Sequence, residues 1–290
     1  MGSAKPPLPG RRLGVMKDRV RLAMLAAPST VAPAFAELRE AVSNEIILEP
    51  LFVPSYVALL SAVEQDPELF AWASPLVALD LVRGQFAVPL VAVNRRGKTN
   101  YYAALVSHAT KGIAHLGHLR GRRVGWVSKL SAAGYVVPRL YLQSLGLDVP
   151  TLFSGERFSG SHARSAMALI AGSVDVIATY AHLDPALSGF TLPTALAGAR
   201  LLATAGPIPG DVVLCGSSID DATRIRVTAA LLSTKFAPNG ALARLMSIDH
   251  FEPTTALHFE PLRRWTQHAL DEALRPFAGP VHHVASVLHQ

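Results

Sequence analysis

A run of β-branched and aromatic residues passes into a turn of small residues and then into a helical pattern over residues 121–135. Residues 123–127 are typical of a buried strand, and residues 128–134 form the turn. A helix that begins directly after such a strand leaves backbone N–H groups unpaired, and these groups and the helix dipole favour an anion. The segment therefore predicts a strand–turn–helix unit that holds a small anionic ligand.

The composition is that of a large globular protein. The chain has 290 residues, 50% of them apolar and 17% charged, which suffices for a large domain or two lobes. A net charge of +6 favours anionic partners. Apart from Arg120, Arg122 and Arg123 the basic residues are scattered, without aromatic–basic repeats, so nucleic acid is not a predicted partner. No run of eighteen apolar residues predicts a membrane span.

Neither a metal, a cofactor nor a catalytic set is predicted. The chain has a single cysteine, Cys215, which excludes an internal disulfide. Because Cys215 lies in an apolar run, its side chain is expected to be buried. His115 and His118 have helical spacing, but no third ligand is indicated. The sequence contains no HExxH motif, no nucleophile elbow and no convincing pair of acids.

Short apolar runs alternate with helical patterns along most of the chain. Strands are expected at residues 20–26, 46–53, 69–73, 85–94, 101–107, 123–127, 151–153, 174–180, 201–205 and 212–215. Helices are expected at residues 32–42, 55–63, 134–145, 161–171, 220–233 and 261–274, and another begins at Pro75. The alternation predicts an α/β fold with mostly parallel sheets and flanking helices, built as two units in series with a return to the first.

Several motifs in a fixed order resemble one known family. They are FAWASP (70–75), YYAALV (101–106), SAAGY (131–135), SGSH (159–162), GSVD (172–175), GPIPGD (206–211) and FEP (251–253). In this order they resemble the phosphonate/phosphite-binding proteins of ABC importers, which have the type II periplasmic-binding-protein fold. The resemblance covers residues 20–275.

The resemblance implies a two-lobed clamp that closes on its ligand about a hinge of two crossover strands. Residues 18–104 plus 204–275 would form lobe 1, and residues 105–203 would form lobe 2. Residues 1–17 are expected to be a flexible tail, and residues 276–290 a C-terminal tail.

Ten residues are candidates for ligand contact. The resemblance implies the side chains of Tyr56, Tyr101, Ser131 and His162, with the backbone at Ala132, Ala133 and Gly134. Positions at strand ends, where open α/β sheets bind ligands, add Ser74, Tyr180 and His182. Plain alternatives are an N-cap at Ser131, a capping or surface histidine at His162, and packing for the tyrosines. Ala132 and Ala133 stand where the family carries two hydroxyl residues, which removes two donors to the ligand.

The leading hypothesis is a binding protein, not an enzyme, for a phosphonate, phosphite, phosphate or carboxylate. An ABC permease or a regulatory protein would be its partner, and a cytoplasmic protein would be a sensor with an altered ligand. Two alternatives remain: an enzyme on this fold, with His162, His182 or Asp175 as acid or base, and a degenerate module that binds a protein. Pro28 and Pro33 interrupt the apolar stretch of a would-be signal peptide, so a cytoplasmic location is expected, or a periplasmic one if the N-terminus is incomplete.

Overall fold

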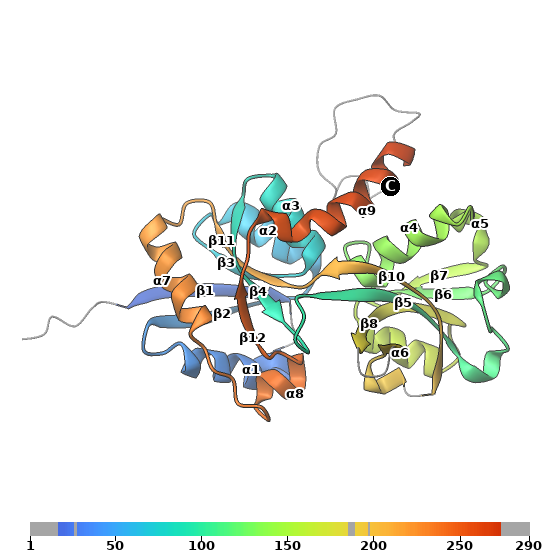
Figure 1. Cartoon of the computed structure of the whole chain (residues 1–290), viewed down its shortest axis with the longest axis horizontal. Helices are drawn as coiled ribbons and strands as arrows, with labels where there is room; N and C mark the ends of the chain where they lie inside the picture. Colours follow the sequence, from blue (N-terminus) through green and yellow to red (C-terminus); the bar gives the residue numbers. More distant parts are fainter. Residues whose placement is uncertain (1–16, 26–27, 185–188, 197, 274–290) are drawn as a thin grey trace, which may run out of the picture.

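Two groups of strands and helices lie side by side in the computed structural model (Figure 1), which describes residues 17–25, 28–184, 189–196 and 198–273. The first sheet has the strand order β12-β4-β11-β3-β1-β2, and the second has the order β10-β5-β8-β6-β7 with β9 paired to β8. We call each sheet with its covering helices a lobe. The two-lobed α/β architecture confirms the predicted fold class.

Nine strands overlap the predicted apolar runs, whereas β7, β9 and β12 were not predicted. The first sheet comprises β1 (Asp18–Leu25), β2 (Ile46–Val53), β3 (Phe70–Ala73), β4 (Ala87–Asn94), β11 (Val212–Gly216) and β12 (His250–Pro253). The second comprises β5 (Asn100–His108), β6 (Arg123–Trp126), β7 (Gly155–Phe158), β8 (Val176–Asp184), β9 (Gly189–Thr191) and β10 (Ala199–Pro209).

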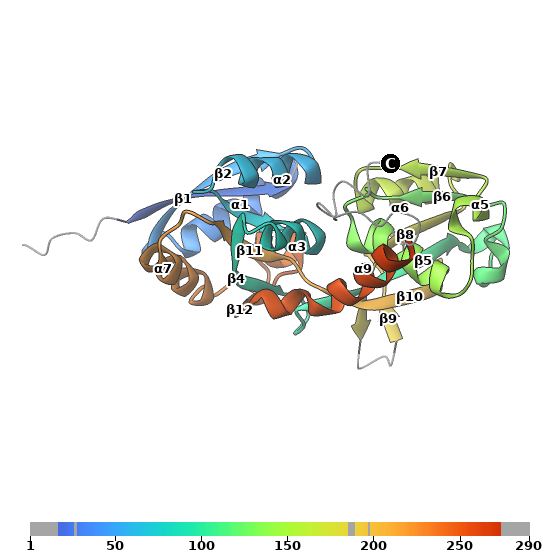
Figure 2. The same cartoon turned by 90° about the horizontal axis from the view of Figure 1, so that it is seen from above.

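Helices cover both sheets. The first lobe has α1 (Pro28–Ala41), α2 (Tyr56–Gln65), α3 (Pro75–Arg83), α7 (Asp221–Leu232) and α8 (Ala241–Met246). The second has α4 (Val137–Ser144), α5 (Val149–Leu152) and α6 (His162–Ile170). Short 3₁₀ helices are η1 (Ala109–Lys111), η2 (Leu116–His118), η4 (Thr194–Leu196) and η5 (Ala256–Phe259), and η3 (Ala132–Val136) is a five-residue π-helix. Helix α9 (Glu260–Ala273) runs from the first lobe toward the second (Figure 2).

The sheets are mixed, which corrects the expectation of mostly parallel pairing. Parallel pairs join β1 to β2 and β3, and β6 to β7 and β8. The strands β10, β11 and β12 pair antiparallel with their neighbours. The return of the chain explains part of this pairing: β10 runs back toward the first lobe beside β5, and β11 enters the first sheet against the direction of β3. Strand β8 also pairs antiparallel with β5 and β9.

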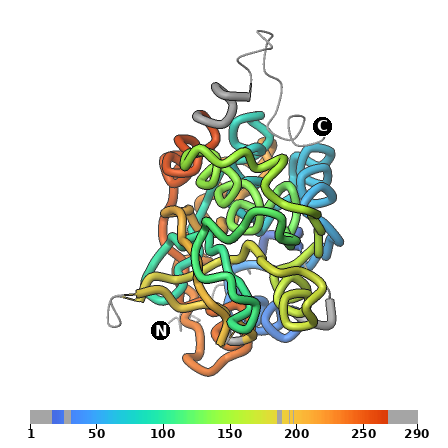
Figure 3. The backbone as a smooth tube through the Cα atoms, turned by 90° about the vertical axis from the view of Figure 1, so that its right-hand side faces the viewer, coloured from blue at the N-terminus to red at the C-terminus, as the bar shows by residue number. Residues whose placement is uncertain are grey.

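Strands β5 and β10 connect the lobes. They pair antiparallel with each other in the second sheet, and the links β4–β5 and β10–β11 carry the chain between the lobes. The middle of the chain thus forms the half that faces the viewer in Figure 3. The predicted lobe boundaries at residues 104 and 204 fall within β5 and β10, and they remain a prediction.

The first sheet is buried on both faces because its central strands alternate between two cores. In β3, Phe70 and Trp72 point to the core that contains Leu38 of α1. Ala71 and Ala73 point to the core that contains Leu59 of α2. Alternate side chains of a strand project to opposite faces, so an uninterrupted apolar run is the expected signature of such a strand.

Cys215 is fully buried in β11, as the apolar run predicted. Burial raises the pKa of its thiol to about 11, so the group behaves as a small apolar side chain.

One predicted strand is wrong. Residues 151–153 do not form a strand; α5 occupies this position, and the next strand, β7, begins two residues later. Pro150 lies in the first turn of α5, and the Thr151 hydroxyl donates to Asp148 Oδ2 at 2.6 Å. These local interactions favour one helical turn over an extended segment. The tail expectations for residues 1–16 and 276–290 lie outside the described residues.

Candidate functional site

A cavity of about 260 Å³ lies between the lobes, where the crossover strands meet the carboxyl end of β3 and the start of η3. From the first lobe it is lined by Tyr56, Ser74 and the segment 245–247, and from the second by Ser131, Ala132, His162, Tyr180 and His182. Arg95, Tyr101 and Asp211 line it from the crossover region. The structure thus brings together side chains from segments that lie far apart in the sequence.

Most of the predicted residues meet in this one cavity. Eight of the ten line it: Tyr56, Ser74, Tyr101, Ser131, Ala132, His162, Tyr180 and His182. Ala133 and Gly134 are buried beside it but are not among its lining residues. That the eight contact a ligand remains a prediction.

The turn that leads from β6 into η3 forms one wall of the cavity. Ser131 is the N-cap of η3, and its Oγ accepts a hydrogen bond from the Gly134 backbone N–H at 3.1 Å. Gly134 is required by packing, because a Cβ atom there would lie 2.4 Å from Val127 Cγ2. The capping alternative for Ser131 is therefore correct, and the same residue also faces the cavity.

Ser74 presents a hydroxyl group without a partner. It directly follows β3 and precedes Pro75, the first residue of α3, but its side chain makes no capping hydrogen bond. Its Oγ is buried and has no hydrogen-bond partner among the described residues. Buried polar groups are nearly always satisfied, so an unpaired hydroxyl that lines a cavity indicates a ligand or water at this point.

Tyr56 and Tyr101 supply two phenol groups. Burial, followed by the nearby Asp211 carboxylate, raises the pKa of Tyr56 to about 12 and that of Tyr101 well above its usual value. Both phenols therefore stay protonated across the physiological range and can donate hydrogen bonds to an oxyanion.

The histidines on the other wall are neutral. Burial lowers the pKa of His162 and of His182 to about 4. His162 Nδ1 lies 3.0 Å from the Thr179 hydroxyl, and its ring meets Tyr180 edge-on at 5.1 Å between centroids. At neutral pH these rings can offer a hydrogen bond but no positive charge.

Sequence reasoning missed Arg95, Asp211 and residues 245–247. Arg95 Nη2 donates to Asp211 Oδ2 at 2.8 Å, and Arg95 Nε donates to the Met246 carbonyl at 3.0 Å. Asp211 was seen only as the end of a turn motif, and Arg95 as one of many scattered arginines. The one available signal was that both directly follow or precede a strand at the lobe crossing.

Asp175, the acid considered for an enzyme, is not at the cavity. It is held in ion pairs with Arg123 at 2.8 Å and Lys111 at 3.8 Å. Among the described residues no cluster of histidine, cysteine or acidic side chains could hold a metal ion. No helix within the described part of the chain is long and apolar enough to cross a membrane.

A two-lobed fold with a polar cavity at the crossing defines a class of ligand-binding clamps, and comparison with known proteins agrees. The family described as "ABC transporter, phosphonate, periplasmic substrate-binding protein" matches residues 26–259. The chain therefore belongs to the phosphonate substrate-binding proteins of ABC transporters. This family consists of periplasmic binding components and not of enzymes. No curated protein matches the chain in sequence.

Solved structures share the fold at low sequence identity. A binding protein component of an ABC phosphonate transporter from Pseudomonas aeruginosa is 16% identical with a TM-score of 0.73, covering 94% of each chain. PhnD1 from Prochlorococcus marinus, solved with methylphosphonate, is 11% identical with a TM-score of 0.71, covering 87% of this chain and 98% of its own. XAC2383 from Xanthomonas citri, bound to chloride ion, is 19% identical with a TM-score of 0.67, covering 88% and 99%.

Proposed function

We propose that this protein binds a small oxyanion, of the phosphonate, phosphite, phosphate or carboxylate type, in the cavity between its lobes. The observation that carries the proposal is the buried Ser74 hydroxyl, which has no partner among the described residues and lines the same cavity as Ser131 and the two phenols. Neutral donors that line one cavity suit an anion, because each hydrogen bond to a charged group contributes about 1.5–3 kcal/mol.

Titration of the purified protein tests the proposal. Methylphosphonate, phosphite, phosphate and acetate are each added in calorimetry and in thermal unfolding. A ligand at one hundred times its Kd stabilises the folded state by about 2.7 kcal/mol, which raises the melting temperature by several degrees. If none of these anions produces heat or a shift in a folded sample, the proposal is wrong.

Ser74→Ala identifies the site. Removal of the unpaired hydroxyl is expected to weaken binding by about tenfold or more, since it removes one donor to a charged ligand. Ser144→Ala is the matched control, because Ser144 is exposed and its hydroxyl bonds the Tyr141 carbonyl at 2.8 Å outside the cavity. Equal affinities for both variants and the unmodified protein would place the ligand elsewhere.

The family suggests a second element of the function: delivery of the ligand to an ABC permease outside the cytoplasmic membrane. The cytoplasmic expectation rests on Pro28 and Pro33, whereas residues 1–16 before this stretch lie outside the described part of the chain. Cell fractionation decides between the two locations. Recovery in the periplasm, and loss of ligand uptake when the gene is deleted, supports the import role, whereas a purely cytoplasmic protein supports a sensor.

A further inference from the structure

The cavity already contains an ion pair of its own. Asp211 Oδ2 accepts hydrogen bonds from Arg95 Nη2 at 2.8 Å and from Trp72 Nε1 at 3.3 Å. Both charged side chains are largely buried, with 19% of Arg95 and 26% of Asp211 exposed. The carboxylate and the guanidinium cancel, so the described residues that line the cavity carry no net charge at neutral pH.

A carboxylate in an anion-binding cavity requires a cation beside it. Without one it would repel the ligand and would itself lose hydration with no compensation. The cation can come from the ligand, as an ammonium group, or from the protein. Here the protein supplies it, because Arg95 is held in place both by Asp211 and by the Met246 carbonyl.

Arg95 carries a positive charge. An ammonium group that approached Asp211 would therefore have to lie against a like charge or displace a hydrogen-bonded arginine.

An apolar surface adjoins the ion pair. Leu245 and Met246, at the end of α8, line the cavity together with the Ala132 methyl group of η3. Such a surface favours an alkyl group, whereas a cation placed against it loses water without gaining partners.

Building on the proposed function, we propose that the Arg95–Asp211 ion pair makes this site select oxyanions with an uncharged, apolar substituent, such as simple alkylphosphonates, and reject their amino-substituted analogues. Arg95 occupies the role that a ligand ammonium group would otherwise fill. The residue therefore determines specificity through Asp211.

Two ligands of matched shape test this inference in the unmodified protein. Propylphosphonate and 2-aminoethylphosphonate differ in that a terminal methyl group is replaced by an ammonium group. Calorimetry at one ionic strength, with methylphosphonate as a third arm, is expected to show propylphosphonate binding at least about tenfold more tightly than the amino analogue. Equal or tighter binding of 2-aminoethylphosphonate would overturn the inference and leave the proposed function standing. If none of the three binds but phosphite, phosphate or acetate does, the inference is wrong and the proposed function stands. If no anion of either series binds, both are wrong.

Substitutions then assign the selectivity to the ion pair. Arg95→Gln exposes the Asp211 carboxylate to the ligand, so the preference for propylphosphonate is expected to disappear or reverse. Arg96→Gln is the control, since Arg96 bonds the Thr191 hydroxyl at 2.8 Å and does not line the cavity. Should Arg95→Gln fail to fold, Asp211→Asn gives the opposite test: the freed guanidinium should bind propylphosphonate more tightly and widen the preference. An unchanged preference in the folded variants would refute the role of Arg95.

Discussion

Ala132 and Ala133 are neighbours in the sequence, but only Ala132 lines the cavity, and Ala133 is 1% exposed within the core. Ala132→Ser is expected to add a donor at the ligand and to tighten oxyanion binding by about tenfold. Ala133→Ser places a hydroxyl in packed apolar surroundings and is expected to cost about 1–3 kcal/mol of stability without any gain in affinity. Calorimetry and urea denaturation of both variants measure the difference. Equal gains in affinity for the two variants would contradict the claim that only Ala132 faces the cavity.

At the scale of single residues, the sequence predicts those site residues that belong to a local motif. Ser131 and His162 were found because a local motif marks each of them. Arg95 and Asp211 were missed because their contact joins positions 116 residues apart and depends on the order of strands in space. A salt bridge of this kind has no local pattern, whereas an N-cap or a strand end has one.

At the scale of elements, the apolar runs predicted most strands because strands buried on both faces leave little choice of residue. Strand β2 has the predicted bounds. The helices α5 and α8, only four and six residues long, were not predicted. At β12 the sequence analysis found a family motif but predicted no strand. Such elements depend on contacts made elsewhere, as when Glu37 of α1 accepts a hydrogen bond from the Leu242 N–H of α8 at 2.9 Å.

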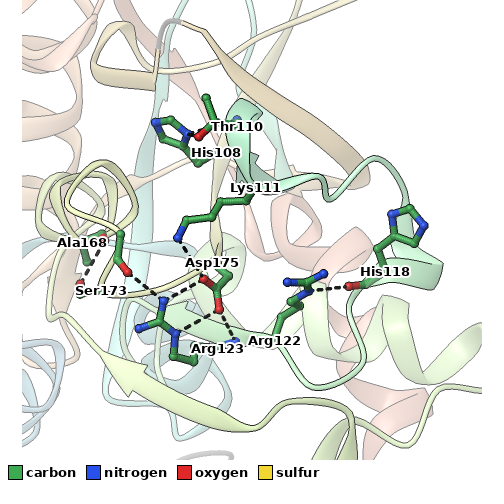
Figure 4. A network of polar contacts seen from close by, with 10 residues as sticks. His108, Thr110, Lys111, His118, Arg122, Arg123, Ala168, Ser173 and Asp175 are labelled. Atoms are coloured by element: carbon green, nitrogen blue, oxygen red, sulfur yellow. Dashed lines mark hydrogen bonds and ion pairs between the residues drawn. The ribbon is translucent and has the colours of Figure 1, made fainter.

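Asp175, directly before β8, ties two other elements of the second lobe together. It accepts a hydrogen bond from Arg123 at the start of β6 and faces Lys111 of η1 (Figure 4). Hydrogen bonds from Arg123 are the main cause that lowers the pKa of Asp175 to about 2. Asp175→Asn is therefore expected to lose about 1 kcal/mol of stability at pH 7, a value reduced for solvent screening.

The stabilisation by Asp175 is expected to decrease as the pH falls. The unfolded Asp175 carboxyl titrates near pH 4, so its contribution is complete above that pH and is lost as the pH falls through about 2. Urea denaturation should show the variant and the unmodified protein converging toward pH 2. Asp221→Asn is the control, because the Asp221 side chain is 84% exposed in its pair with Arg224 and should change stability little. A constant difference from pH 7 to pH 2 would refute the ion-pair account.

At the scale of the whole molecule, the lobes meet around neutral histidines. His162 begins α6 and His182 lies on β8 of the second lobe, and both line the cavity. His258 of η5 comes from the first lobe and lies 3.1 Å from the Gly210 carbonyl at the crossing. Burial is the main cause that lowers the pKa of all three below the ordinary value. The folded junction between the lobes therefore favours the uncharged form of these three histidines.

This arrangement predicts a loss of stability in mild acid. The unfolded histidines take up protons near pH 6.5, whereas folded His162 and His182 do so only near pH 4. Between these values the unfolded state binds more protons, so stability is greatest above pH 6.5 and falls as the pH drops toward 4. His162→Gln should remove on the order of 1–2 kcal/mol of this fall, and His115→Gln, at an exposed position in the second lobe, should not. Denaturation series at pH 7 and pH 4.5 measure it, and identical pH dependence in His162→Gln and the unmodified protein would show that this ring is not buried at the junction.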